Sequence, residues 1–341
     1  MMPERGETTP DTAEQPSSTD GRAALGHPFV CRLLELGLPF AADARPPAGC
    51  RTVSAPARLD TLAAGCRTPL ADINPPPLPQ AFLALRQAAR DPMSTMAEVA
   101  AIISMDPGLA AYVLRLANSV LYSFPSRVET VDRAVACIGL AEIQTLAMGA
   151  TLGKAFKDPP RADVLVMKDF WRHAVSVGLL SSALAERLGA GGRERFFTAG
   201  LLHDMGRLLL AIAEPDLAGL ALARAAATGG SLDAAEREAL DFDHAVLGGR
   251  VCGKWQLPDS LGEAVACHHA PNRCPENDLA AVVHVADFMA NALGLRATPA
   301  AGLPVLDLSV LAGLGLTEAD PSFLLDVLEA GLAPLTALFA V

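Results

Sequence analysis

The segment Ala199-Gly-Leu-Leu-His-Asp-Met-Gly206 decides the interpretation of this sequence, because it places one histidine and one aspartate inside an apolar run. We expect a buried helix over about 193–213, with leucines and a methionine around a single polar notch. In such a helix four residues would share one face, since they fall at i, i+3, i+4 and i+7: Gly200, His203, Asp204 and Arg207.

A histidine beside an aspartate in an apolar helix has two explanations. Without a partner, the buried pair His203-Asp204 would carry a desolvation cost of several kcal/mol. The two side chains therefore either hydrogen-bond to each other at a helix crossing or bind a ligand. Imidazole and carboxylate together are the ligands that Mn, Fe and Zn accept. The pair alone leaves a structural pair and a metal site equally open.

Further candidate ligands lie on separate helices of the second half of the chain. Each has an ordinary alternative: a helical histidine is usually core or surface, and Asp287 could serve in a salt bridge or a cap. Asp243, which precedes one of the histidines, is expected to be an N-cap. The role of His284, three residues before Asp287, stays open. A two-metal site would result if these seven residues converge: His173, His203, Asp204, His244, His268, His269 and Asp287.

The composition indicates a helical protein. Of the 341 residues, 51% are hydrophobic and only 5% are aromatic, and alanine and leucine dominate. The sequence contains no convincing alternation with a period of two, so we predict an all-α fold. Helices are expected over 78–89, 94–105, 107–118, 130–138, 140–156, 163–188, 193–213, 216–227, 243–255, 259–269 and 277–293, with two or three more in 303–341.

Charge and cysteine content limit the partners and the compartment. A net charge of −11 argues against nucleic acid as a partner, because phosphate binding needs a basic surface. The amino terminus does not resemble a signal peptide, and charges interrupt each apolar stretch, so we expect a cytoplasmic protein without a membrane span. The seven cysteines form no CxxC pair, which favours free thiols in a reducing compartment. Cys267 and Cys274 fit no zinc-finger spacing.

Two blocks of the sequence resemble the HDOD family, the HD-related output domains of bacterial signalling proteins. The first contains Pro76-Pro-Leu-Pro79, Ile103-Ser-Met-Asp-Pro-Gly-Leu-Ala-Ala-Tyr-Val-Leu-Arg-Leu-Ala-Asn-Ser119 and Ala134-Val-Ala-Cys-Ile-Gly-Leu140. The second contains Phe170-Trp-Arg-His173, the His203-Asp204 segment, Asp243-His244, Trp255-Gln-Leu-Pro258 and His268-His269. The resemblance spans about residues 74–290.

The resemblance implies a domain organisation and a role. It implies an HD-type helical bundle preceded by a smaller helical subdomain, and signalling or regulation through protein partners rather than metabolism. Many members are regarded as output or scaffold modules. We therefore divide the chain into a largely disordered or weakly structured region 1–73, a helical subdomain 74–156, an HD-like part 157–295 and C-terminal helices 296–341.

At the seven candidate ligands the chain is also similar to the HD-GYP cyclic-dinucleotide phosphodiesterases. Two features depart from those enzymes: Arg207 stands where they carry a lysine, and Ala-Pro-Asn-Arg-Cys-Pro follows His269 in place of a Gly-Tyr-Pro motif. If the site is active, Asp204 and Arg207 would be its catalytic residues. One metal would be held by His173, His203, Asp204 and Asp287, and a second, bridged through Asp204, by His244, His268 and His269.

Three functions stay open at this point. The first is a regulatory output module that retains a site for Fe, Mn or Zn and binds signalling proteins through residues 74–156. The second is a metal-dependent hydrolase of a phosphoester, with a nucleotide or a cyclic dinucleotide as substrate. The third is a switch in which occupancy of the pocket changes the docking of the two helical halves.

Overall fold

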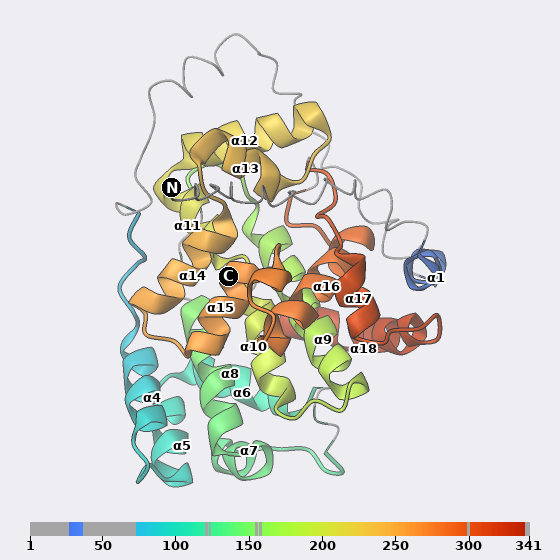
Figure 1. The fold of residues 1–341 in the computed structure, drawn as a ribbon. Helices are drawn as coiled ribbons and strands as arrows, with labels where there is room; N and C mark the ends of the chain where they lie inside the picture. The colour runs from blue at the N-terminus through green and yellow to red at the C-terminus, as the bar shows by residue number, and fades with distance from the viewer. Residues whose placement is uncertain are drawn as a thin grey trace, which may run out of the picture.

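The computed structural model describes residues 27–36 and 73–337, apart from 120, 121, 123, 154, 155, 157, 158, 299 and 300. Within these ranges every regular element is a helix, which confirms the all-α class (Figure 1). The helices are α1 Pro28–Leu36, α4 Gln80–Arg90, α5 Met96–Ser104, α6 Pro107–Ala117, α7 Val131–Ile138, α8 Leu140–Gly153, α9 Met167–Arg187, α10 Arg193–Leu202, α11 Met205–Ala213, α12 Pro215–Thr228, α13 Leu232–Leu240, α14 His244–Lys254, α15 Asp259–Cys267, the 3-10 turn η2 Pro271–Arg273, α16 Asp278–Ala292, α17 Leu308–Gly313 and α18 Asp320–Thr336.

Helices α4 to α8 form one group, and helices α9 to α18 form a second group that is connected to it. Helices α4 to α8 lie together at one end of the fold, and α12 and α13 lie at the opposite end (Figure 1). Between them, α9 packs against α10, α16 and α18, while α14 packs against α11 and α15. Helix α8 connects the groups because it contacts both α4 and α10. The division of the chain at residues 156 and 295 stays a prediction.

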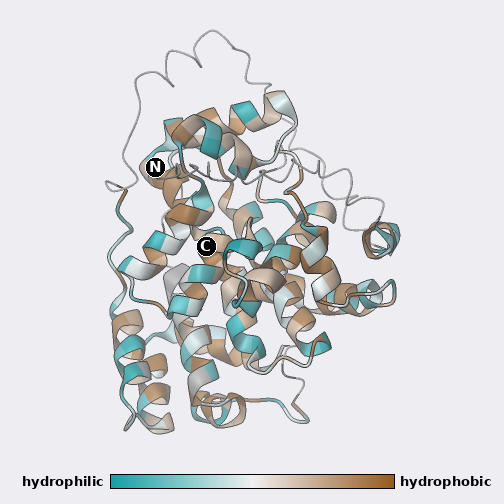
Figure 2. Cartoon of the chain, in the orientation of Figure 1, coloured by the Kyte–Doolittle hydropathy of each residue, from teal (hydrophilic) through white to brown (hydrophobic). Residues whose placement is uncertain are grey.

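Helix α9 forms the centre of the fold. Every residue of 173–185 is buried, so this stretch is enclosed on all faces. Its neighbours supply large apolar side chains, among them Phe196, Phe197 and Phe288, each at most 1% exposed. By contrast, outer helices such as α4 and α12 carry hydrophilic as well as hydrophobic residues (Figure 2). Because this stretch of α9 is buried, it places His173 in the interior of the fold.

The expected continuous helix over 193–213 is wrong, because the chain leaves the helix at the His203-Asp204 pair. Helix α10 ends at Leu202 and α11 begins at Met205. The ring Nδ1 of His203 lies 2.6 Å from the carbonyl oxygen of Gly200, an acceptor that the backbone of a continuous helix would use. Asp204 adopts φ −95° and ψ 10° and starts the next helix.

Close helix crossings at two glycines fix the position of this turn. A Cβ on Gly200 would lie 2.7 Å from the carbonyl oxygen of Val177 on α9. A Cβ on Gly206 would lie 2.1 Å from the carbonyl oxygen of His244 on α14. Gly200 therefore packs against α9. The two crossings hold the turn between α9 and α14.

Several helix starts are as expected. Asp106 accepts backbone N–H groups of Gly108 and Leu109 at 2.9 and 3.0 Å. Asp243 accepts from the backbone of Val246 at 2.9 Å, which supports its predicted role as an N-cap. The helix expected over 94–105 begins slightly later, because Thr95 caps α5 and the helix starts at Met96.

Two helices lie outside the predicted set. Helix α13 follows Ser231 in a stretch where charged residues leave only a short apolar stripe. Helix α1 lies in the region expected to be weakly structured and packs on α18 through the buried residues Phe29 and Leu33. The rest of the region 1–73, expected to be largely disordered or weakly structured, falls outside the described residues apart from residues 27 and 73.

One stretch of the described residues is long and apolar enough to span a membrane. It covers Arg193–Ala213, that is α10 and α11 together, and 83% of its apolar window is buried inside the fold. Burial accounts for its composition, because these helices form part of the core.

Candidate metal centre

The fold brings all seven predicted ligands together. His173 lies on α9, the His203-Asp204 pair forms the α10–α11 turn, and Asp287 lies on α16. The other three come from the first turn of α14 and the end of α15. All are buried except His269, which is partly buried: His173, His203, Asp204, His244, His268, His269 and Asp287.

The carboxylate of Asp204 lies at the centre of the group. Its Oδ1 is 3.1 Å from Nε2 of His244, 3.6 Å from Nε2 of His203 and 4.0 Å from Nε2 of His268. Its Oδ2 is 3.7 Å from Nε2 of His173. One carboxylate is therefore shared among imidazoles from four parts of the chain.

Asp287 provides the second carboxylate. Its Oδ1 lies 3.2 Å from Nε2 of His173 and 3.6 Å from Nε2 of His203. Asn291, one helical turn further along α16, donates its side-chain amide to the same oxygen at 2.7 Å. The amide holds Asp287 with an oxygen directed at the two histidines.

Contacts on the far side of each ring fix four of the five histidines. Nδ1 lies 2.7 Å from the carbonyl oxygen of Leu295 in His173, and 2.7 Å from that of Val265 in His268. His203 bonds to Gly200 as described above. Because these partners only accept hydrogen bonds, Nδ1 carries a proton, and in the neutral ring Nε2 presents a lone pair to the centre.

The fourth ring is fixed by a residue that the sequence analysis did not identify. Glu236 on α13 accepts from both the backbone N–H and the ring Nδ1 of His244, at 2.8 and 2.5 Å. Both side chains are almost fully buried. In the sequence, Glu236 could have been singled out only as a glutamate on the inner face of α13, and α13 was not among the predicted helices.

The arrangement leaves acceptor atoms that a cation would satisfy. Nε2 of His203 and Nε2 of His268 are buried without a hydrogen-bond partner. Nε2 of His244 and Nε2 of His269 lie 2.9 Å apart. Two lone pairs at this distance would repel each other, so a proton or an ion has to lie between the two nitrogens. The donor set therefore fits a divalent metal ion that accepts nitrogen and oxygen ligands.

Several of the candidate ligand atoms lie close enough together to hold a metal ion. Three sets of such atoms lie within 4.8 Å of one another. The sets are His173–His203–Asp204, then His244–His268–His269, and finally His203–His268–Asp287.

The electrostatics keep the carboxylates ionised. Burial opposes ionisation, but the neighbouring histidines hold the pKa of Asp204 and of Asp287 well below the ordinary value. Burial lowers the pKa of His244, yet the charges of Glu236 and Asp204 outweigh it and raise the pKa. For His268, burial and the neighbouring histidines both lower the pKa. The centre thus combines permanent negative charge with a neutral imidazole, as a cation site requires.

A narrow cavity of about 30 Å³ opens beside the ligands. It holds water-sized groups but not a nucleotide. Arg207 lines it, donating Nη1 to Oδ2 of Asp204 at 3.2 Å, while its buried Nη2 has no partner. Asp233 and Gly302 also line the cavity.

His284 does not join the site. Its Nδ1 lies 2.7 Å from the carbonyl oxygen of His268, and its Nε2 accepts the backbone N–H of Asp307 at 2.9 Å. Both ring nitrogens are therefore used, and His284 supports the backbone that carries His268.

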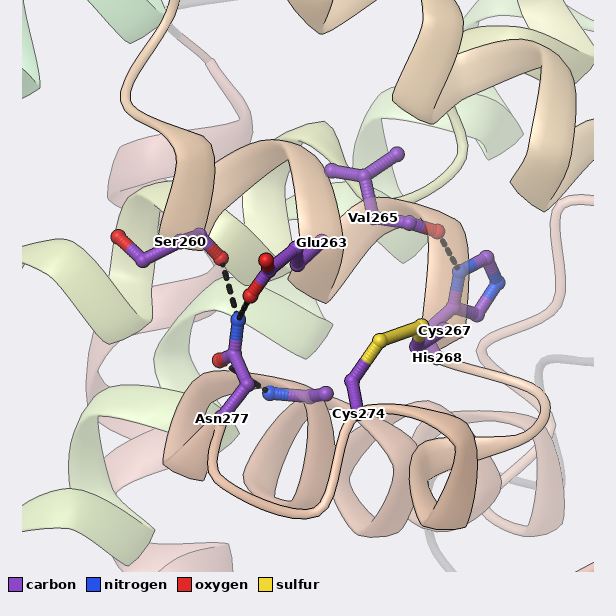
Figure 3. Close-up of a disulfide and its surroundings, with 8 residues drawn as sticks. Ser260, Glu263, Val265, Cys267, His268, Cys274 and Asn277 are labelled. Carbon is purple, nitrogen blue, oxygen red and sulfur yellow. Dashed lines mark hydrogen bonds between the residues drawn. A yellow bond between two sulfur atoms is a disulfide. The ribbon is translucent and has the colours of Figure 1, made fainter.

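The cysteines beside the histidine pair are joined, which corrects the expectation of free thiols for these two residues. Cys267 and Cys274 form a disulfide between the end of α15 and the loop before α16 (Figure 3). Proximity across this turn was not visible in a spacing of seven residues. Among the cysteines that the structure describes, Cys137 and Cys252 are not in disulfides.

An all-helical bundle with a buried His/Asp cluster defines a protein of the HD type. The HDOD domain matches residues 76–271, more than half of the sequence, and the chain therefore belongs to the HDOD family.

Solved structures share the fold. A Shewanella amazonensis SB2B protein named "Putative phosphohydrolase" has 24% identity and a TM-score of 0.61, over 86% of this chain and 100% of its own. An HDOD domain protein of unknown function from Geobacter sulfurreducens has 23% identity and a TM-score of 0.58, over 83% and 97%. At these identities the likeness concerns the fold alone.

A similar sequence occurs in a longer protein. An uncharacterized protein of Treponema pallidum (strain Nichols) is 25% identical over 229 residues, which are 66% of this chain and 43% of that protein. The chain thus spans less than half the length of this relative.

Replacing Glu236 with alanine is expected to weaken metal binding. His244 would lose the acceptor that fixes its ring, and changes of this kind cost roughly 10–100-fold in metal affinity. Competition for Zn²⁺ against a chromophoric chelator measures the loss, and Glu236→Gln should recover part of it because the amide oxygen still accepts. Glu238→Ala, an exposed change on the same helix, is the control. Equal affinities in wild type and Glu236→Ala would contradict the role of Glu236.

Proposed function

We propose that this chain is a regulatory protein of the HDOD family whose HD-type half binds two divalent metal ions, Fe, Mn or Zn. The observation that carries the proposal is the pair of buried, unpartnered Nε2 atoms of His203 and His268 beside the ionised carboxylate of Asp204. Structural packing alone would leave such atoms at a cost of about 1–3 kcal/mol each. Bound metal ions would satisfy them.

The residues divide between two positions. His173, His203 and Asp287 would hold the first ion, and His244, His268 and His269 the second, with Asp204 shared. The outer contacts of Glu236 and Asn291 would keep the ligands in place. When ions are bound, the chemistry available is activation of a water and neutralisation of charge on a phosphate.

A regulatory role is supported by the small size of the cavity beside the ligands, about 30 Å³. The proposed partners are signalling proteins, and the proposed binding region is the subdomain 74–156. The proposed remainder of the chain consists of the HD-like part over 157–295 and the C-terminal helices 296–341. The acidic chain makes nucleic acid a poor partner, and we keep the cytoplasm as the proposed location.

Helix α14 offers a route between the metal site and the proposed partner region. His244 lies in its first turn, and the carbonyl oxygen of Trp255, just beyond its last turn, accepts from Arg86 on α4 at 3.0 Å. Lys254 binds the side-chain oxygen of Asn74 at 2.6 Å. Occupancy of the second position would thereby bias the docking of α4 on α14.

Asp204→Asn should abolish binding of both ions, because the neutral amide cannot bridge two cations. Metal content by plasma mass spectrometry, after loading with Mn, Fe or Zn, should fall from about two equivalents to less than one. Circular dichroism checks that the variant is folded. Asp320→Asn, a change of a buried carboxylate outside the site, should keep two equivalents. Wild-type protein that binds none of the three metals would refute the proposal.

Hydrolysis of a phosphoester is the second candidate function, and a specific observation favours it. Arg207 lines the cavity beside Asp204, and its buried Nη2 has no hydrogen-bond partner, so this guanidinium would be available to a phosphate oxygen. The cavity would have to widen to admit a nucleotide or a cyclic dinucleotide. Asp204 and Arg207 are the residues we assign to catalysis in this case.

If the chain is a hydrolase, Arg207→Ala should lower kcat on bis(p-nitrophenyl) phosphate by about 100-fold with the metal content unchanged. Arg207→Lys should keep part of the rate, because it retains the charge but not the planar guanidinium. Metal-loaded wild type without turnover of this ester, of phosphomonoesters or of cyclic dinucleotides would reject hydrolysis and leave the regulatory proposal standing.

A further inference from the structure

A disulfide encloses two of the candidate ligands. Cys267 ends α15, Cys274 follows η2, and His268-His269 lie between them in a loop closed by the sulfur–sulfur bond (Figure 3). No other described ligand lies inside a covalently closed loop. The state of the two cysteines therefore bears on the positions of His268 and His269.

The two histidines differ in how firmly they are held. His268 is fully buried, its Nδ1 bonds to Val265, and its carbonyl oxygen bonds to His284. His269 is partly buried, and its one side-chain hydrogen bond in the described structure is the contact with Nε2 of His244. Among the described residues, no hydrogen-bond acceptor contacts the far side of the His269 ring, unlike the rings of the other four candidate ligands. The closed loop takes the place of that acceptor.

The surrounding helices are anchored independently of the disulfide. The side chain of Asn277, at the start of α16, donates to the carbonyl oxygen of Ser260 at 2.8 Å and to Glu263 at 3.1 Å, both on α15 (Figure 3). These bonds and the buried packing of α15 on α16 would survive opening of the disulfide. Opening would release the loop 268–274 and leave the bundle folded.

We propose that Cys267 and Cys274 are a reversible redox modification site that controls the second metal position, an inference that rests on the metal-binding function proposed above. In the disulfide state the loop holds His269 beside His244, and the second ion binds. In the dithiol state His269 is released, and the second position keeps His244 and His268 only. The first position does not depend on the loop.

The change between the two states is a thiol–disulfide exchange. Thiols reduce the protein disulfide, and a small-molecule disulfide oxidises the protein dithiol. For reduction, a thiolate of the reductant attacks the sulfur of Cys274, which is more accessible than the buried Cys267. Cys267 leaves as a thiolate and takes up a proton, and a second thiol, that of the same dithiol or of another glutathione molecule, then displaces Cys274 as a thiol. Two electrons and two protons pass to the protein as the reductant becomes a disulfide. Oxidised glutathione reverses the reaction and leaves as two thiols.

The test is metal titration of the full chain at a controlled thiol state. Protein is equilibrated with oxidised or with reduced glutathione, and alkylation with peptide mass spectrometry identifies which cysteines are paired. After the glutathione is removed without oxygen, Zn²⁺ binding is measured by competition with a chromophoric chelator. We expect two equivalents in the oxidised state, and in the reduced state one tight equivalent with the second at least about tenfold weaker.

Variants separate this control from other effects. Cys274→Ser should show the reduced pattern under both conditions, whereas Cys137→Ser, at an exposed free cysteine, should respond as wild type does. Equal binding of two equivalents in both states, or failure of Cys267 and Cys274 to pair, would overturn redox control and leave the metal site intact. Absence of Zn²⁺ binding in both states would overturn both proposals.

Discussion

The ionised carboxylate of Asp204 is the group on which the rest of the site depends. It is buried, it faces the Nε2 atoms of four histidines, and its second oxygen accepts from Arg207. A carboxylate in the interior needs compensating positive charge, and among the described residues Arg207 is the permanent cation in direct contact with it. The remaining compensation has to come from protons on the histidines or from bound metal. Because of this requirement, apolar packing alone does not account for the cluster.

The fold meets the requirement through its backbone. The helix breaks at His203 because the ring takes the carbonyl oxygen of Gly200, and the break directs Asp204 into the space between α9 and α14. Carbonyl groups at Gly200, Val265 and Leu295 hold three rings, while Glu236 holds a fourth. The precision of the ligand set thus comes from main-chain atoms near helix ends. Side chains on a loop would be less well fixed.

The sequence was sufficient for the fold class and for the identity of the candidate ligands, because histidines within apolar helices stand out against the core. It was not sufficient for the contacts behind the ligands. The helix break depends on the rotamer of His203, and the role of Glu236 depends on how α13 docks on α14. Likewise, the pairing of Cys267 with Cys274 follows from the turn after α15, and the position of His284 follows from the course of the chain around Asp307. These are tertiary relations that no local pattern contains.

The most direct measurement of the central claim is anomalous X-ray scattering from crystals of the protein loaded with Zn²⁺ or Mn²⁺, recorded at the absorption edge of the metal. Two peaks are predicted inside the bundle, one beside His173 and Asp287 and one beside His244 and His269, with Asp204 between them. The absence of anomalous density at both places in metal-loaded crystals, or density confined to the protein surface, would contradict the account.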